Sequence, residues 1–177
     1  MEIKGSQKMS WIIRQAQATD AENFFSYLLE AAGDTAGISR EMLPFLIDAE
    51  RDYIHHHLET ANCNLLFATI EDRIVGTVTV NGEPGVSDVY LTVSIHPAYH
   101  GYALGLDLIR SAINWARLQG SICRVLMTID AESVGTLRLF ERLGFTADGP
   151  GRVSYTCYGT TLEFRAVGEF AEVYRAS

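Results

Sequence analysis

The hydrophobic positions follow two different periods along the chain, and together these predict a mixed fold. Apolar residues recur at helical spacing in four segments: 21–32, 39–59, 103–119 and 133–143. Alternating or continuous apolar runs typical of strands occupy residues 11–16, 64–70, 74–80, 89–95 and 122–129, and three further candidates are 153–158, 162–166 and 170–174. The pattern predicts an α/β (α+β) domain in the order β α α β β β α β α β β, with about seven strands and about four helices.

Local signals set the ends of several elements. Thr19 with Glu22 has the spacing of a capping box, so the first helix is expected to start there. Gly33 and Gly37 end that helix, and Pro44 lies near the start of the second helix or kinks it. The apolar side of the second helix is predicted to carry Met42, Phe45, Leu46, Ala49 and Tyr53.

The connections predict how the strands pair. The polar break 71–73 makes a hairpin of the strands 64–70 and 74–80, which are therefore antiparallel. The crossover from strand 89–95 through a helix to strand 122–129 predicts one parallel pair. No repeat or linker interrupts the pattern, so residues 1–177 are expected to form a single domain with a loose polar start at 1–9.

Composition narrows the class of protein. Apolar residues make up 47% and charged residues 20% of the 177, which predicts a packed globular core. The net charge of −8 argues against a nucleic-acid partner and fits a cationic one, although acidity also serves solubility. Three cysteines without a CxxC motif favour a reducing cytoplasm, and no run resembles a signal peptide or a membrane span.

The segment from Ile95 to Gly105 carries the most chemical information. A strand that ends in a loop of small residues and opens into a helix leaves unpaired backbone N–H groups at the first helical turn. The helix dipole adds positive potential there. Small residues at 101, 103 and 105 let a phosphate approach the backbone. The segment therefore predicts a site for a phosphorylated ligand.

Two motifs in this order resemble the GNAT superfamily of N-acetyltransferases. The first is Pro97 followed by His100-Gly-Tyr-Ala-Leu-Gly105, and the second is Phe140-Glu-Arg-Leu-Gly-Phe145. The resemblance covers residues 11–175. Four residues depart from the family pattern: His100 replaces Arg or Gln, Ala103 replaces Gly, Phe140 replaces a Tyr that protonates the leaving thiolate, and Ser133 replaces Asn.

The resemblance implies an activity and a set of binding residues. The enzyme would move an acetyl group from acetyl-coenzyme A to a primary amine of a small molecule or peptide, by direct attack in a ternary complex. The pantetheine arm would lie along the strand 89–95 and the pyrophosphate on the following turn. The implied cofactor-binding residues are Val93, Ser94, Ile95, His100, Gly101, Tyr102, Ala103, Leu104, Gly105 and Ser133.

The residues that would transfer protons are less clearly indicated by the sequence than the cofactor-binding residues. Asp88 is the first candidate for the general base and His96 the second, although Asp88 is more simply explained as a turn residue at the start of the strand and His96 as a solvated residue before Pro97. With Phe140 at the usual Tyr position, the thiolate would take its proton from another hydroxyl or from water, or leave unassisted. The alternative hydroxyls are Tyr99, Tyr155 and Tyr158.

Other interpretations stay open or are set aside. The same departures also suit a non-catalytic acyl-coenzyme A sensor of the same fold. No metal site is expected, because the consecutive residues His55, His56 and His57 would point about 100° apart on a helix. A homodimer through the segment 170–174 stays an open alternative.

Overall fold

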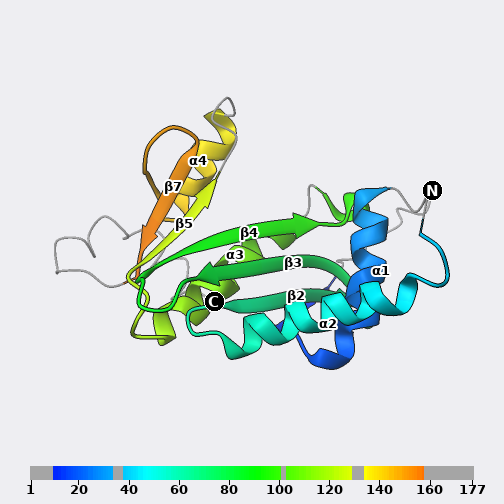
Figure 1. Cartoon of the computed structure of the whole chain (residues 1–177). Helices are drawn as coiled ribbons and strands as arrows, with labels where there is room; N and C mark the ends of the chain where they lie inside the picture. The colour runs from blue at the N-terminus through cyan, green and yellow to red at the C-terminus, as the bar shows by residue number, and fades with distance from the viewer. Residues whose placement is uncertain (1–9, 34–37, 101–102, 129–133, 158–177) are drawn as a thin grey trace, which may run out of the picture.

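The described part of the chain folds into one seven-stranded mixed sheet with four α-helices against it. The computed structural model describes residues 10–33, 38–100, 103–128 and 134–157 (Figure 1). The strands are β1 (Ile12–Gln15), β2 (Asn64–Ile70), β3 (Arg73–Gly82), β4 (Asp88–Ile95), β5 (Arg124–Thr128), β6 (Thr146–Ala147) and β7 (Arg152–Thr156). The helices are α1 (Ala21–Ala32), α2 (Leu43–Glu59), α3 (Leu104–Leu118) and α4 (Val134–Arg142).

The strands lie in the order β1-β2-β3-β4-β5-β7-β6, and their pairing confirms the predicted hairpin and the predicted parallel pair. β4 and β5 run parallel through the crossover helix α3, and the other neighbours are antiparallel. The hairpin between β2 and β3 turns at Glu71 and Asp72, which adopt φ values of 49° and 65°. Positive φ at both central residues suits a tight turn between twisted antiparallel strands.

The helices cover opposite faces of the sheet (Figure 1). α3 packs on the face that carries Val78, Val89 and Leu91. α1 and α2 pack on the other face, against Leu65 and Phe67 of β2. Because successive strand side chains alternate between faces, each face receives its own hydrophobic cluster.

α3 lies very close to β3 and β4. A Cβ at Gly76 would lie 3.0 Å from Leu108 Cδ1, and a Cβ at Gly105 would lie 2.9 Å from Ile95 Cδ1. Both distances are shorter than ordinary packing allows, so glycine at these positions permits the approach. The contact fixes the start of α3 at the end of β4.

The start of the first helix differs from the prediction. A short 3-10 turn, Ala18–Asp20, precedes α1, and the Thr19–Glu22 capping box is wrong. The carboxylate of Asp20 accepts the Gln17 N–H at 2.8 Å and pairs with Arg14. The capping box of the structure is thus formed by Gln17 and Asp20 around the 3-10 turn, two residues earlier than the predicted pair. Gly33 ends α1 with φ of 68°, as predicted.

The buried face of α2 also differs from the prediction. Pro44 lies in the first turn, but Phe45 is 77% exposed and Met42 is 51% exposed. Ile54 and His57 are the buried residues of the helix. The helix is rotated because the stripe through Ile47, Ile54 and Leu58 meets β2 and α1. No helix in the described ranges is long and apolar enough to cross a membrane.

Several predictions fall outside the described residues. They concern the loose start at 1–9, Gly37, and the candidate strands 162–166 and 170–174.

Candidate functional site

The sheet opens between its two central strands. β4 pairs with β5 only from Asp88 to Leu91, and within the described residues the second half of β4 pairs with β3 alone. Figure 1 shows β5, β7 and α4 diverging from β4. From Thr92 to Ile95, the main chain of β4 therefore faces the opening without a β5 partner. An extended ligand can bind such an edge with its own amides, as an added strand does.

The open half of β4 leads directly to the start of α3. His100 follows the 3-10 turn Pro97–Tyr99, and its Nε2 donates to the carbonyl of Ile95 at 2.8 Å. Ala103 is the N-cap of α3 and offers no side-chain oxygen to the first helical amides. These amides and the helix dipole together suit an anion. The open half of β4 and the start of α3 are thus adjacent sites, the first for an extended part of a ligand and the second for a phosphate group.

The predicted binding residues split into two groups. The structure brings Val93, Ser94, Ile95, His100, Ala103, Leu104 and Gly105 into one continuous path from the opening to the start of α3. Gly101, Tyr102 and Ser133 lie outside the described residues. Along the path Val93 and Ile95 pack toward the α3 cluster, so Ser94 points to the opposite face.

The structure places Asp88 and His96 at opposite ends of β4 and does not bring them together. Arg124 donates to both Asp88 oxygens, with Nε 3.1 Å from Oδ1. His96 Nδ1 accepts the Ala98 N–H at 3.1 Å, and its Nε2 lies 3.3 Å from Glu30. Both groups are thus held by structural contacts, and a role as general base stays a prediction for each.

Phe140 lies in the hydrophobic core. Its side chain is 6% exposed, and its ring meets the Phe145 ring edge-on at 5.2 Å. Tyr155 is buried in the same cluster. Tyr99 is half-buried with its ring 5.7 Å from that of His96, and Tyr158 lies outside the described residues.

Sequence analysis missed a row of polar side chains on the α1 and α2 face of the sheet. We call it the polar track; it consists of three cross-strand pairs, Thr77–Ser94, Thr79–Thr92 and Asn81–Tyr90. Thr77 and Thr79 are 5% and 7% exposed. The signal in the sequence is the alternation of Thr77, Thr79 and Asn81 within the otherwise apolar β3, because a polar face on a buried strand departs from simple core packing.

One side chain from each covering helix contacts the polar track. Tyr27 of α1 is 2% exposed and donates its phenolic hydrogen to Ser94 Oγ at 2.9 Å. Burial raises the pKa of the Tyr27 phenol, so the group stays protonated at neutral pH. His57 of α2 is also 2% exposed, and its Nε2 lies 2.9 Å from Asn81 Oδ1.

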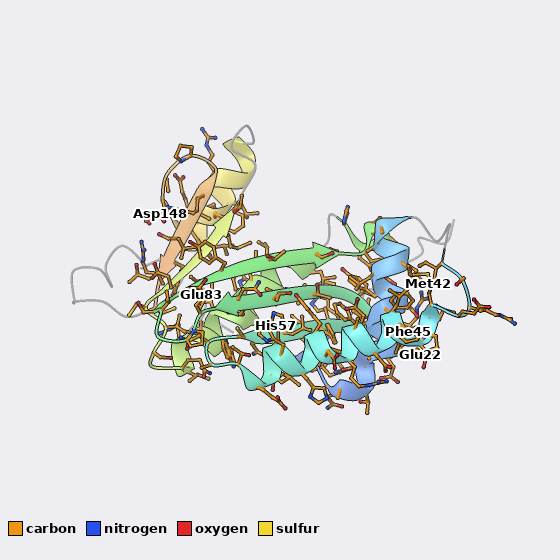
Figure 2. The ribbon with its side chains drawn as sticks, in the orientation of Figure 1. Glu22, Met42, Phe45, His57, Glu83 and Asp148 are labelled. Carbon is orange, nitrogen blue, oxygen red and sulfur yellow. The ribbon has the colours of Figure 1, made fainter. Side chains whose placement is uncertain are left out.

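His57 extends inward between α2 and the sheet (Figure 2). His55 and His56 are exposed, so the three consecutive histidines point in different directions. His57 Nδ1 lies 2.9 Å from the Tyr53 carbonyl, which can only accept, so Nδ1 carries a proton.

A pocket of about 340 Å³ lies at the closed end of the polar track. It is lined by Asn81, Gly82, Glu83, Val86, Asp88 and Tyr90. Figure 2 shows Glu83 beyond the end of β3. The hollow thus lies beside the part of β4 that pairs with β5, at the end of the polar track that is far from the opening and from the start of α3.

Comparisons with known proteins agree with this architecture. The model of the acetyltransferase (GNAT) family matches residues 11–145, so the chain belongs to that family. No curated protein matches the chain significantly.

Solved structures share the fold. A GNAT-family acetyltransferase from Streptococcus pneumoniae is 17% identical with a TM-score of 0.68, over 83% of this chain and 99% of that chain. The PaiA N-acetyltransferase from Thermoplasma acidophilum, in complex with coenzyme A, is 17% identical with a TM-score of 0.59, over 84% and 99%. A GNAT-family acetyltransferase from Brucella melitensis, in complex with acetyl-coenzyme A, is 23% identical with a TM-score of 0.57, over 85% and 90%.

Proposed function

We propose that the protein is an N-acetyltransferase that transfers the acetyl group of acetyl-coenzyme A to a primary amine of a small molecule or peptide, by direct attack in a ternary complex. One observation carries the proposal: the half of β4 without a β5 partner ends beside the uncapped start of α3, where Ile95 packs against Gly105. The membership in the acetyltransferase family and the relatives solved with coenzyme A or acetyl-coenzyme A support it.

The residues along this path fit the co-substrate. Acetyl-coenzyme A supplies an acetyl group activated as a thioester. The main chain of Val93 and the N–H of Ile95 bind the amides of the pantetheine arm, and the first amides of α3 at Leu104 and Gly105 bind the pyrophosphate. A main-chain N–H at the open edge of β4 polarises the thioester carbonyl.

The exposed members of the polar track, Asn81, Tyr90 and Thr92, provide the approach for the amine. They lie on the α1 and α2 face, so the acceptor and the co-substrate meet at the open edge of β4 from different sides. Hydroxyl and amide side chains orient a polar amine there without burying an unpaired charge. The net charge of −8 favours a cationic acceptor over an anionic one.

Binding and turnover are measured separately to test the proposal. Titration calorimetry with acetyl-coenzyme A is expected to show binding, and a panel of amines is expected to release a thiol. Gly105→Asp adds a carboxylate at the anion site and is expected to abolish binding. Gly105→Ala is the matched control, because it adds the same Cβ beside Ile95 without charge. No binding by the wild-type protein at millimolar co-substrate contradicts the proposal.

A second candidate function is an acyl-coenzyme A sensor without turnover. The burial of Phe140 against Phe145 favours it, since this side chain provides no acid to the leaving thiolate. Tight binding of acetyl-coenzyme A with no thiol release across the amine panel would select the sensor.

A further inference from the structure

A chain of hydrogen-bonded hydroxyl groups ends at the open half of β4. The Thr77 side chain hydrogen-bonds to Tyr27, and Tyr27 donates to Ser94 Oγ at 2.9 Å. A hydroxyl oxygen that accepts a hydrogen bond keeps its own hydrogen for a third group. Ser94 can therefore donate its own hydrogen to a ligand beside the polar track, and it keeps a lone pair that can accept a hydrogen bond.

Ser94 lies at the place on β4 where the reacting groups are proposed to meet. Ser94 lies between Val93 and Ile95, where β4 has no β5 partner, and its side chain points to the face that carries the polar track. The reacting amine and the sulfur of the co-substrate both belong to this region in the proposed function. Ser94 is thus placed to contact both reacting groups.

Acetyl transfer from a thioester to an amine needs one proton to move. The nitrogen forms a bond to the acetyl carbon, the carbon–sulfur bond breaks, the nitrogen loses a proton and the sulfur gains one. The proton lost equals the proton gained, so a neutral group that accepts one proton while it gives up another completes the balance. A hydroxyl does both without a net change of charge.

We propose that Ser94 Oγ passes the proton from the amine nitrogen to the departing sulfur, and that Tyr27 positions Ser94 for this transfer. The inference rests on the proposed acetyltransferase function and deepens it. In the transfer, the nitrogen–hydrogen bond breaks as a new bond to Ser94 Oγ forms, and the original Ser94 hydrogen moves to sulfur. Tyr27 keeps its own proton throughout.

Other side chains that the sequence suggested for proton transfer are held in different contacts. Phe140 has no ionisable group and lies in the core. Asp88 accepts from Arg124 with both oxygens, at the closed end of the opening. His96 contacts Ala98 N–H through one ring nitrogen and Glu30 through the other. A hydroxyl shuttle at Ser94 accounts for proton movement without any of them.

The first test compares rates in the full chain. Ser94→Ala is expected to lower kcat by about 100-fold, within the range known for proton-transfer groups, while Ser94→Thr restores most of it. Tyr27→Phe is expected to lower kcat by about 10-fold with little change in the acceptor KM, because Ser94 remains but loses its orientation. Thr69→Val is the matched control, since it removes a buried hydroxyl of β2 that is not part of the polar track, and it is expected to leave kcat unchanged.

The second test does not depend on turnover. Bound coenzyme A is titrated, and the ultraviolet absorbance of its thiolate gives the pKa of the thiol. The Ser94 O–H stabilises the thiolate, so Ser94→Ala is expected to raise that pKa by about one unit relative to wild type. Tyr27→Phe is expected to raise it by less, and Thr69→Val not at all.

The outcomes separate this inference from the proposed function. If coenzyme A binds and amines are acetylated, but Ser94→Ala changes neither kcat nor the thiol pKa, the shuttle is overturned and the acetyltransferase stands. A loss of kcat that comes only with a lower melting temperature, and with an unchanged thiol pKa, also overturns it. If wild-type protein binds no coenzyme A, the proposed function itself fails.

Discussion

The Glu30 carboxylate lies 3.3 Å from His96 Nε2 and joins the end of α1 to the residues that follow β4. Arg73 pairs with the same carboxylate at 2.9 Å, so strand β3 joins the contact. His96 Nδ1 accepts the Ala98 N–H, which leaves the ring hydrogen on Nε2 to be donated to Glu30. The imidazole thus ties the turn before α3 to the helix that carries Tyr27.

His96 is expected to act through this turn rather than through proton transfer. His96→Asn keeps a side-chain acceptor for the Ala98 N–H, as asparagine does in Asx turns, but removes the titratable ring. We expect it to retain kcat within about threefold, whereas loss of a general base costs about 100-fold or more. His96→Ala, which removes the acceptor too, is expected to lower stability by about 1 kcal/mol in urea unfolding. A 100-fold loss of kcat in His96→Asn would support the base.

Asp88→Asn tests the other candidate base. Asp88 and Arg124 join the first paired residues of β4 and β5, and their side chains are 27% and 43% exposed. A pair this exposed contributes less than about 1 kcal/mol. We expect Asp88→Asn and Arg124→Gln to lower the melting temperature by similar small amounts and to change kcat alike. A large loss of kcat in Asp88→Asn alone would assign the carboxylate to proton transfer.

The three cysteines are expected to differ in reactivity. Burial raises the pKa of the Cys157 thiol from 9.0 to about 12. Cys63 is buried as well, and Cys123 is exposed. Iodoacetamide at pH 8 is therefore expected to modify Cys123 alone in the folded protein and all three cysteines in urea, as measured by mass spectrometry. Rapid modification of Cys157 in the folded state would contradict its burial.

The raised pKa of Cys157 also predicts a loss of stability in alkali. Below pH 9 the thiol is protonated in both states, so it adds no pH dependence. Between pH 9 and about 12 the unfolded chain loses the proton and the folded chain keeps it, which favours unfolding. Urea unfolding of Cys157→Ala is expected to decline less steeply over this range than that of wild type. Parallel declines would show that Cys157 does not contribute.

Gly82→Ala is expected to destabilise the end of β3. A Cβ there would lie 2.5 Å from the carbonyl oxygen of Asn62, which is main chain and cannot rotate away. We expect a loss of about 1–3 kcal/mol in urea unfolding. Gly76→Ala is the matched control in the same strand, because the two shortest contacts of its Cβ would be with the side-chain ends of Leu108 and Leu104, while the Ser94 carbonyl oxygen lies at an ordinary contact distance of 3.5 Å. It is therefore expected to cost less. Equal losses would show that the Asn62 contact relaxes.

Most strands of the sheet are predicted well, because each strand is marked by a short apolar run in the sequence. β2 has the predicted bounds, and β4 and α3 differ by about one residue from the predicted ranges. The rotation of α2 was not predicted, because its apolar residues lie on more than one side and only packing against β2 and α1 selects the stripe that includes Ile54.

The candidate site was predicted where it depends on a continuous segment. The run from Val93 to Gly105 carries its own signal, since a strand, a turn of small residues and a helix follow one another. Tyr27 and His57 were missed, because they reach β4 and β3 across 67 and 24 positions of sequence. No local pattern encodes contacts of that kind.

The opening beside β4 has a consequence for solubility. A strand with unsatisfied main-chain groups normally invites another chain to pair with it, which leads to aggregation. Here the stretch from Thr92 to Ile95 pairs with β3 but has no β5 partner, and it lies in the middle of a seven-stranded sheet, with strands on either side of the gap. An extended ligand can enter this gap, but the flanking strands block a strand of a second folded molecule from pairing there. The main-chain groups along the opening thus remain accessible to an extended ligand but not to the strands of other protein molecules.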